Sequence, residues 1–344
     1  MYIEEDTIDD LLNITYSNLL TNGFATTASK GAMIESLNAT LILRHPRSRL
    51  SVSESRSQLI SCVGELLWYL TADNSLEFIT YYITNYHKFI GYLKNENTPV
   101  LGAYGPRIFK KNKDGLSQFS SVADLLVEKP STRRAVIAVY SSKDTLREDD
   151  RDIPCTCNFQ FFIRNHQLHL TTYMRSNDAV KGLVHDIFSF TIFQELMLAE
   201  ISKAYKNKEN HDLVLGTYTH IVGSLHIYKE DIPEVEQYLE VEGWQNKTQM
   251  PPIDSAYLKD DKKLMVALEK KLRLNDSSID FMAFKKFKDD FWKDIAIVLI
   301  FYHLYKKTID KERDKALILT LLNNCSSLPV RTFLEKRIHE LGIA

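Results

Sequence analysis

The residues between Ile153 and Asp186 combine the side chains that an active site for a nucleotide needs. Cys155 follows a proline and offers a thiol, which is nucleophilic when a nearby cation stabilises its thiolate form. Arg175 and Ser176 are adjacent and offer a guanidinium and a hydroxyl that can grip a phosphate together. The segment ends on the carboxyl group of Asp186. It therefore predicts a site at which a thiol reacts with a phosphate-bearing substrate.

Cys155 also has a second interpretation, because a lone cysteine at the start of a strand is more often a small buried apolar residue. A nucleophilic role requires a cation beside the thiol. Residues 158–163 and 167–174 have the pattern of two strands, and a hairpin between them would bring Arg175 back to Cys155. The hairpin therefore decides between the two interpretations.

Five further residues have a functional and a structural interpretation. Glu65 lies on the apolar side of a predicted helix, where acids are rare unless they are paired or functional, although a partly exposed position also explains it. Arg133 and Arg134 form either a solvated pair or a phosphate site. His226 and Tyr228 point to the same side of a strand, either in the core or toward a sugar hydroxyl.

The composition of the 344-residue chain is that of a globular protein with a sizeable core, since 44% of its residues are hydrophobic and 26% are charged. A net charge of −2 argues against a nucleic-acid partner. The longest apolar run, Ile295–Tyr305, is too short to span a membrane. The N-terminal sequence MYIEEDTIDD lacks the features of a signal peptide, so we expect a cytoplasmic location and reduced cysteines. Cys155 and Cys157 have no second ligand pair at zinc spacing, which argues against a metal site.

The order of predicted elements is α/β, followed by a helical region. Helical periodicity or caps predict helices at 7–20, 53–70 (capped by Ser53), 75–90, 122–128 and 186–203. Besides the hairpin, strands are predicted at 37–43, 134–140 and 213–228, and glycines and prolines predict a loop at 95–109. The residues from 232 to 344 have a helical pattern, with a plausible boundary loop at 249–253.

Several short motifs recur in a fixed order along the chain. They are GELLWYL at 64–70, LGAYG at 101–105, STRRAV at 131–136, PC at 154–155, QFF at 160–162, YMRSND at 173–178, Gly182 and GSLHIY at 223–228. Each motif alone is weak, but together they resemble the thymidylate synthase superfamily from about residue 5 to residue 235. The resemblance implies a homodimer with a large mixed β-sheet flanked by helices. It divides the chain into a catalytic domain (1–235) and a helical C-terminal region (236–344) that packs on it.

The resemblance also implies a reaction. Cys155 would attack C6 of a pyrimidine nucleotide, and C5 would then take a one-carbon unit from 5,10-methylenetetrahydrofolate. Arg175 and Ser176 would bind the phosphate, joined by Arg133 and Arg134 from the partner subunit. The early phosphate-binding arginine of the family has only Lys30 in its place.

The remaining site residues follow from the same resemblance. His226 and Tyr228 would hold the sugar 3′-hydroxyl, and Glu65 would order the catalytic water network. Tyr104 would assist proton removal from C5. The folate would lie against Asp178, which meets its pterin ring, and against Gly182.

Asp186 departs from the family in a way that concerns the substrate. Synthases carry an asparagine at this position, 31 residues after the nucleophile, and that amide is complementary to the N3–H and O4 of uracil. Cytosine presents the opposite pattern, to which a carboxyl group is suited, and the carboxyl can give a proton to N3. The alternative is an aspartate that complements a helix dipole.

Three more departures concern the final step. Thr156 replaces the histidine that follows the family nucleophile, no tryptophan occurs between Trp68 and Trp244, and the C-terminal sequence RIHELGIA lacks the short apolar closing tail. In synthases the indole and the tail shield the transferred carbon so that hydride reaches it. Without them water can add, which leaves a hydroxymethyl group.

These observations predict a folate-dependent 5-hydroxymethyltransferase of a cytidine monophosphate, with dCMP favoured over CMP because of Ser176. The alternatives are a thymidylate synthase acting on dUMP and a non-catalytic paralogue that binds nucleotide or a protein partner. The joint presence of Cys155, Arg175, Glu65 and Tyr104 argues against the paralogue.

Overall fold

The computed structural model describes residues 1–28, 31–53, 56, 58–90, 99–146, 152–242, 247–307 and 311–343. Its centre is a mixed sheet of seven strands, in which β1 and β3 are parallel, as are β6 and β7, whereas the other neighbours are antiparallel. The order is β1-β3-β7-β6-β5-β4, with β2 paired to β3. The strands are β1 (Tyr2–Glu5), β2 (Phe24–Ala28), β3 (Gly31–Leu43), β4 (Val136–Ala138), β5 (Thr156–Arg164), β6 (Gln167–Asp178) and β7 (Val214–Tyr228).

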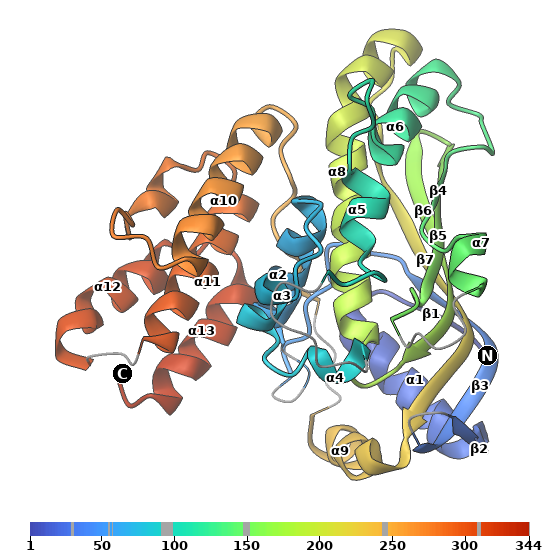
Figure 1. Cartoon of the computed structure of the whole chain (residues 1–344), viewed down its shortest axis with the longest axis horizontal. Coiled ribbons are helices and arrows are strands. Elements are labelled where there is room, and N and C mark those ends of the chain that lie inside the picture. The colour runs from blue at the N-terminus through green and yellow to red at the C-terminus, as the bar shows by residue number, and fades with distance from the viewer. Residues whose placement is uncertain are drawn as a thin grey trace.

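Helix α8 (Leu183–Glu209) lies against one face of this sheet, and further helices lie beyond it (Figure 1). Most of its first fifteen residues are buried, which explains why its sequence is apolar all round rather than striped. The other helices of this part are α1 (Ile8–Asn22), α2 (Leu59–Leu70), α3 (Leu76–Tyr82), α4 (His87–Ile90), α5 (Tyr104–Phe109), α6 (Gln118–Glu128) and α7 (Ser142–Thr145). The predicted mixed sheet flanked by helices is confirmed.

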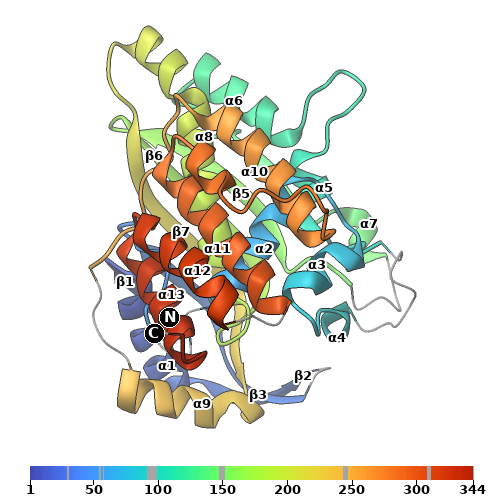
Figure 2. The same cartoon turned by 90° about the vertical axis from the view of Figure 1, so that its left-hand side faces the viewer.

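The C-terminal residues form a group of helices on the side of α2 and α3 that faces away from the sheet (Figures 1 and 2). The Tyr82 hydroxyl donates to Glu269 at 3.0 Å, and the Tyr302 hydroxyl donates to the Tyr81 carbonyl at 2.7 Å. The elements of this group are α10 (Leu258–Arg273), a 3-10 turn (Ala283–Lys286), α11 (Asp290–Lys306), α12 (Lys311–Asn324) and α13 (Leu328–Glu340). They are preceded by α9 (Ile232–Gln237) and a π-helical turn (Tyr238–Glu242), which lie apart from the group, and Tyr238 of the turn packs on Tyr16 of α1 (Figure 1). The helical pattern from residue 232 onward is thus confirmed as secondary structure.

The long apolar run of the C-terminal region belongs to α11, whose residues from Phe291 to Leu304 are almost all buried among the other helices. In the part of the chain that the structure describes, no helix has the length and apolarity that crossing a membrane requires.

The predicted helix at 53–70 is wrong in its first turn. Helix α2 begins only at Leu59, and its N-cap residue Gln58 makes no side-chain cap. The Ser53 hydroxyl accepts from the backbone N–H of Arg56 at 3.0 Å, and residues 54, 55 and 57 lie outside the described part. The side chain of Arg56 is buried, donates to the carbonyl of Val180 at 2.9 Å and pairs with Glu234. This tertiary contact holds the segment away from the helix.

Two other boundary predictions are corrected. The helix predicted at 75–90 is two helices, α3 and α4, because the chain turns at Ile83 and the Tyr86 ring packs edge-on against Trp68 at 5.5 Å. The loop predicted at 95–109 contains α5, since Pro106 lies in its first turn, where the missing N–H would be unpaired in any case. Gly105 lies where a Cβ would come within 2.7 Å of the Tyr69 carbonyl oxygen. Residues 95–98 lie outside the described part.

Candidate active site

A cavity of about 850 Å³ opens beside the sheet, between α2, α8 and the loops before α5 and β5. Ten of the predicted site residues line it, namely Glu65, Tyr104, Cys155, Arg175, Ser176, Asp178, Gly182, Asp186, His226 and Tyr228. Arg133 and Arg134 do not line it but lie exposed before β4, and Lys30 lies outside the described residues. The structure therefore brings together in one chain every predicted residue except those three.

The sheet topology explains how residues far apart in sequence meet at this cavity. Strands β6 and β7 are parallel and in register, so that Asp178 is opposite His226 and Ser176 is opposite Ser224. Parallel neighbours end at the same edge of a sheet, which is where their terminal side chains gather. The rings of His226 and Tyr228 lie 4.9 Å apart and line the cavity together.

The predicted hairpin is confirmed and places a cation beside the candidate nucleophile. Strands β5 and β6 pair antiparallel, and the backbone N–H of Arg175 donates to the Cys155 carbonyl at 2.9 Å. Its guanidinium lies 3.7 Å from Cys155 Sγ and donates to the Pro154 carbonyl at 2.9 Å. The half-buried thiol therefore has the positive neighbour that a thiolate nucleophile requires.

Glu65 and Asp186 face the cavity as two carboxyl groups with raised pKa values. Burial raises the pKa of Glu65 to about 7, although a hydrogen bond with Tyr69 opposes the shift. Burial, and then the nearby charge of Glu65, raise the pKa of Asp186 well above its ordinary value. The amide of Asn177 donates to Asp186 Oδ2 at 2.5 Å. A neutral Asp186 carboxyl thus offers one donor and one acceptor to the cavity.

Asp186 does lie in the first turn of α8, as the helix-dipole interpretation requires. That interpretation needs a charged carboxylate, because only the charge interacts favourably with the dipole. Burial and the nearby charge of Glu65 raise the pKa of Asp186, which works against the charged form that this interpretation needs. The position of the carboxyl group on the cavity wall favours a functional role instead.

Tyr104 is fixed by a stack and by a backbone contact. Its ring stacks on Tyr69 with centroids 5.3 Å apart, and its hydroxyl accepts from the backbone N–H of Thr156 at 3.3 Å. Burial, followed by the charge of Cys155, raises the pKa of Tyr104 well above 10. The phenol is therefore neutral at neutral pH and can relay a proton only through its O–H group.

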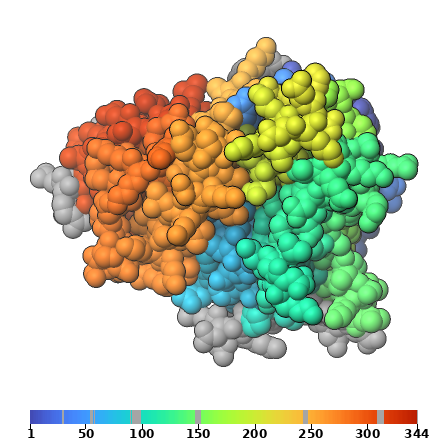
Figure 3. All heavy atoms as spheres, turned by 90° about the horizontal axis from the view of Figure 1, so that it is seen from above, coloured from blue at the N-terminus to red at the C-terminus, as the bar shows by residue number. Residues whose placement is uncertain are grey.

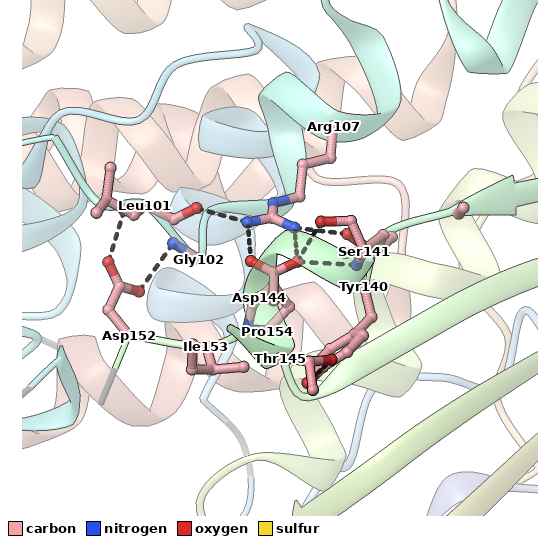
Figure 4. A network of polar contacts seen from close by, with 12 residues as sticks. Leu101, Gly102, Arg107, Tyr140, Ser141, Asp144, Thr145, Asp152, Ile153 and Pro154 are labelled. Carbon is pink, nitrogen blue, oxygen red and sulfur yellow. Dashed lines mark hydrogen bonds and ion pairs between the residues drawn. The ribbon is translucent and has the colours of Figure 1, made fainter. Parts of the chain in front are cut away.

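Asp152 is a site residue that the sequence interpretation missed (Figure 4). Its carboxylate accepts the backbone N–H groups of Leu101 at 2.5 Å and Gly102 at 2.9 Å. A Cβ on Gly102 would lie 2.4 Å from Asp152 Oδ1, so this approach requires glycine. The contacts of Asp152 and the Tyr104–Thr156 contact attach the segment at the start of α5 to the chain just before and just after Cys155.

An ion pair supports the same loop from its other end (Figure 4). Arg107 donates to both carboxylate oxygens of Asp144, at 2.6 and 2.8 Å, and to the Leu101 carbonyl at 2.9 Å. The Arg107 guanidinium and hydrogen bonds from Ser141 hold the pKa of Asp144 well below its usual range. No sequence signal identifies Asp144 or Asp152, because both depend on loops that meet only in the folded chain.

The wall of the cavity also contains residues with no predicted role. His185 Nε2 lies 2.8 Å from the Ser61 hydroxyl, and burial lowers the pKa of His185 to about 4, so that its ring is neutral at pH 7. Trp68 contributes an indole from α2. Asp178 accepts from the backbone N–H groups of Val180 and Lys181 at 2.9 and 3.0 Å, which shapes the turn into α8.

Comparison with known proteins agrees with this geometry. The chain is 27% identical over 215 residues to the deoxyuridylate hydroxymethyltransferase of Bacillus phage SP01, covering 59% of this chain and 53% of the relative. It is 24% identical over 212 residues to the thymidylate synthase of Mycoplasma mobile, covering 55% of this chain and 69% of the relative. The chain thus spans about half the length of the phage relative. The family model described as thymidylate synthase matches residues 39–276, which is more than half of the sequence. The chain belongs to the thymidylate synthase family.

Proposed function

We propose that this protein transfers a one-carbon unit from 5,10-methylenetetrahydrofolate to C5 of a cytidine monophosphate, and that water completes a 5-hydroxymethyl group. We propose dCMP as the favoured substrate over CMP. The observation that carries the proposal is the carboxyl group of Asp186, which faces the cavity and has a pKa raised well above its ordinary value.

The hydrogen bond from Asn177 determines which oxygen of this carboxyl group donates to a bound base and which accepts from it. Since the amide donates to Oδ2, it favours the acid proton on Oδ1. A base that places its amino group at Oδ2 and an acceptor nitrogen at Oδ1 then satisfies both oxygens, and cytosine has N4 and N3 in that arrangement. Uracil in the same pose places its O4, an acceptor, against the acceptor Oδ2, and its N3–H, a donor, against the Oδ1 hydroxyl. Each of these two buried mismatches costs about 1–3 kcal/mol.

The residues of the cavity divide the reaction among them. Cys155 Sγ forms a bond to C6 while Asp186 protonates N3, which gives C5 the nucleophilic character it needs. The folate supplies carbon at the oxidation level of formaldehyde, and Tyr104 assists the loss of the C5 proton. The folate would then leave the transferred carbon, water would add to that carbon, and Glu65 would take the proton of the water. Departure of the Cys155 thiolate from C6, with return of the N3 proton to Asp186, would restore the ring. No hydride is transferred, so the folate leaves as tetrahydrofolate.

The phosphate and the sugar would be held next to each other at the edge of the sheet where β6 and β7 end. Arg175 and Ser176 lie at the end of β6 toward Cys155, and His226 and Tyr228 lie at the end of β7. Asp178 and Gly182 would lie on the folate side of the cavity.

We propose that a second copy of the chain completes the phosphate site with its Arg133 and Arg134, which are exposed here. The face of the sheet opposite α8 suits such a homodimer. On this face the ring of Tyr173 is 38% exposed, whereas its strand neighbours Thr172 and Met174 are buried on the other side.

The product of a single incubation tests the proposal. The protein is incubated with methylenetetrahydrofolate and dCMP, CMP or dUMP, and the nucleotides are analysed by mass. A gain of CH₂O on a cytidylate supports the proposal. A gain of CH₂ on dUMP, with absorbance from dihydrofolate, contradicts it and identifies a thymidylate synthase. If no nucleotide reacts, the proposal also fails, and nucleotide binding without turnover would identify a non-catalytic paralogue.

The phage relative named deoxyuridylate hydroxymethyltransferase favours a second candidate, hydroxymethyl transfer to dUMP. A neutral carboxyl group can satisfy the uracil edge if its proton lies on the oxygen facing O4. A gain of CH₂O on dUMP in the same incubation, with none on dCMP or CMP, would establish this alternative.

A further inference from the structure

A second cavity, of about 530 Å³, lies where the C-terminal helices meet the catalytic part of the chain. Helix α10 forms one side, and the ends of α2, α5 and α6 and the middle of α8 form the other. On the face seen in Figure 3 the orange segment meets the green and yellow ones at this junction. The lining residues are Leu70, Phe109, Lys111, Ser117, Phe119, Ser120, Leu196, Glu200, Leu258, Lys259, Lys262, Lys263 and Val266.

The charge of this cavity is strongly positive, since four lysines and one glutamate line it. Over the described ranges, none of the four lysine side chains makes a hydrogen bond or an ion pair. Lys262 is half-buried, and its ammonium lies 5.4 Å from the centroid of the Phe109 ring. Burial lowers the pKa of Lys262, and the charge of Glu200 only partly opposes the shift. A bound anion would compensate this desolvated charge.

The floor of the cavity is apolar and aromatic. The rings of Phe109 and Phe119 lie 5.1 Å apart at 40°, and Leu196, Leu258 and Val266 complete the surface. Apolar walls with a few convergent polar groups are typical of small-molecule sites, and about 530 Å³ lies within their usual range.

We propose that this cavity is a second ligand site, which binds a small amphiphilic anion. The ligand has an aromatic or cyclic apolar body, which lies on Phe109 and Phe119, and a phosphate or carboxylate, which pairs with Lys262 and Lys111. Either anionic group provides the same recognition.

Three helices that line the first cavity also contribute residues to this second cavity. Leu70 is the last residue of α2, which carries Glu65, and Phe109 is the last residue of α5, which begins with Tyr104. Leu196 lies on α8, which carries Asp186. A ligand at this junction therefore contacts the far ends of α2 and α5 and the middle of α8, three helices that line the first cavity, and it acts as an effector.

Binding of 1-naphthyl phosphate and 1-naphthoate to the full chain tests the site, with 1-naphthol as the uncharged counterpart. We expect both anions to bind, 1-naphthol to bind at least tenfold more weakly, and high salt to weaken the anions. Lys262→Gln should weaken the anions by about tenfold, which corresponds to one hydrogen bond to a charged group. Lys270→Gln is the matched control, because Lys270 is an exposed residue of the same helix that does not line the cavity.

Hydrogen exchange locates the bound anion independently of any catalytic activity. Protection should appear in peptides covering the ends of α2 and α5 and the start of α10. The proposal is overturned if neither anion binds, if Lys262→Gln binds like Lys270→Gln, or if protection is confined to the residues around Cys155 and Arg175. Stronger binding of the phosphate or of the carboxylate identifies which anionic group the site prefers.

Discussion

Asn177 donates its side-chain amide to Asp186 Oδ2 at 2.5 Å, and both residues line the cavity that contains Cys155. Asn177 is buried at the end of β6, whereas Asp186 lies in the first turn of α8, so that the turn between them brings the amide and the carboxyl together. This contact makes the two oxygens of Asp186 inequivalent, and the proposed choice of base depends on that difference.

Replacing Asn177 should therefore relax the choice of base. In Asn177→Ala the proton of Asp186 is free to occupy either oxygen, so we expect the ratio of kcat/KM for dCMP over dUMP to fall by about tenfold, the effect of one hydrogen bond to a polar partner. Asn85→Ala, at an exposed position, is the control. An unchanged ratio in Asn177→Ala would show that the amide does not orient the carboxyl group.

Glu65 should control the dependence of turnover on pH. Because burial raises its pKa to about 7, the carboxylate form that accepts the proton of the added water accumulates as the pH rises through neutrality. We expect kcat to rise with pH up to a plateau above this value. Glu65→Gln should lower kcat by about 100-fold and remove that rise, because general-base catalysis contributes this order of magnitude. If Glu65→Gln retains the rise of kcat with pH, a titrating group other than Glu65 causes that rise.

The same raised pKa has a consequence for stability. A carboxyl group whose folded pKa exceeds its unfolded value stabilises the fold fully below the unfolded pKa and loses that contribution as the pH rises through the folded value. Glu65 should thus lower the free energy of unfolding between about pH 4.5 and pH 7. Denaturant unfolding of the wild type and of Glu65→Gln measures the effect. The variant should show the shallower decline over this range, and equal slopes would contradict the assignment.

Asp152 should act on turnover through the position of Cys155 relative to Tyr104. Asp152→Asn keeps one acceptor oxygen for the N–H groups of Leu101 and Gly102, whereas Asp152→Ala keeps none. We expect kcat to fall moderately in the first and by about 100-fold in the second, with a small change in KM for dCMP, since misplacement of reacting groups has effects of this size.

The control for Asp152 separates positioning from folding. Asp114→Asn changes an exposed acid of another loop and should leave kcat unchanged. The rate of covalent adduct formation with 5-fluoro-dCMP should follow kcat in the Asp152 variants. If these variants lose thermal stability but form the adduct at the wild-type rate, Asp152 is only structural.

Cys155→Ala should abolish turnover and covalent adduct formation while leaving dCMP binding within about threefold, because the thiol contributes a bond rather than affinity. Cys157→Ala, two residues further along in β5, is the matched control and should retain the adduct. Intact-protein mass after incubation with 5-fluoro-dCMP distinguishes the two variants. An adduct in Cys155→Ala would show that a different residue is the nucleophile.

The sequence predicted those parts of the site that depend on local patterns. Alternating strands at 158–163 and 167–174 were sufficient to place Arg175 beside Cys155, and the motif order placed His226 and Tyr228 on the same cavity. These features follow from the alternation of side chains along a strand and from the register of strand pairing, both of which can be inferred from local sequence patterns.

The parts that the sequence did not predict depend on tertiary contacts. The role of Asp152 depends on the contact of its loop with Leu101 and Gly102. The helix predicted from Ser53 begins only at Leu59, and the Arg56 guanidinium before it donates to the carbonyl of Val180. Helix α5 was taken for a loop because glycine and proline normally interrupt helices, whereas here both lie in its first turn. Arg133 and Arg134 are exposed in a single chain, and their proposed role in the site requires a second copy of the chain.

The most direct test of the account is the ratio of kcat/KM for dCMP and dUMP, measured with methylenetetrahydrofolate in the wild type and in Asp186→Asn. The account predicts that the wild type prefers dCMP and adds CH₂O to it, and that Asp186→Asn reverses the preference toward dUMP. Preference of the wild type for dUMP, or an Asp186→Asn variant that still prefers dCMP, would contradict the assignment of Asp186 as the residue that selects cytosine.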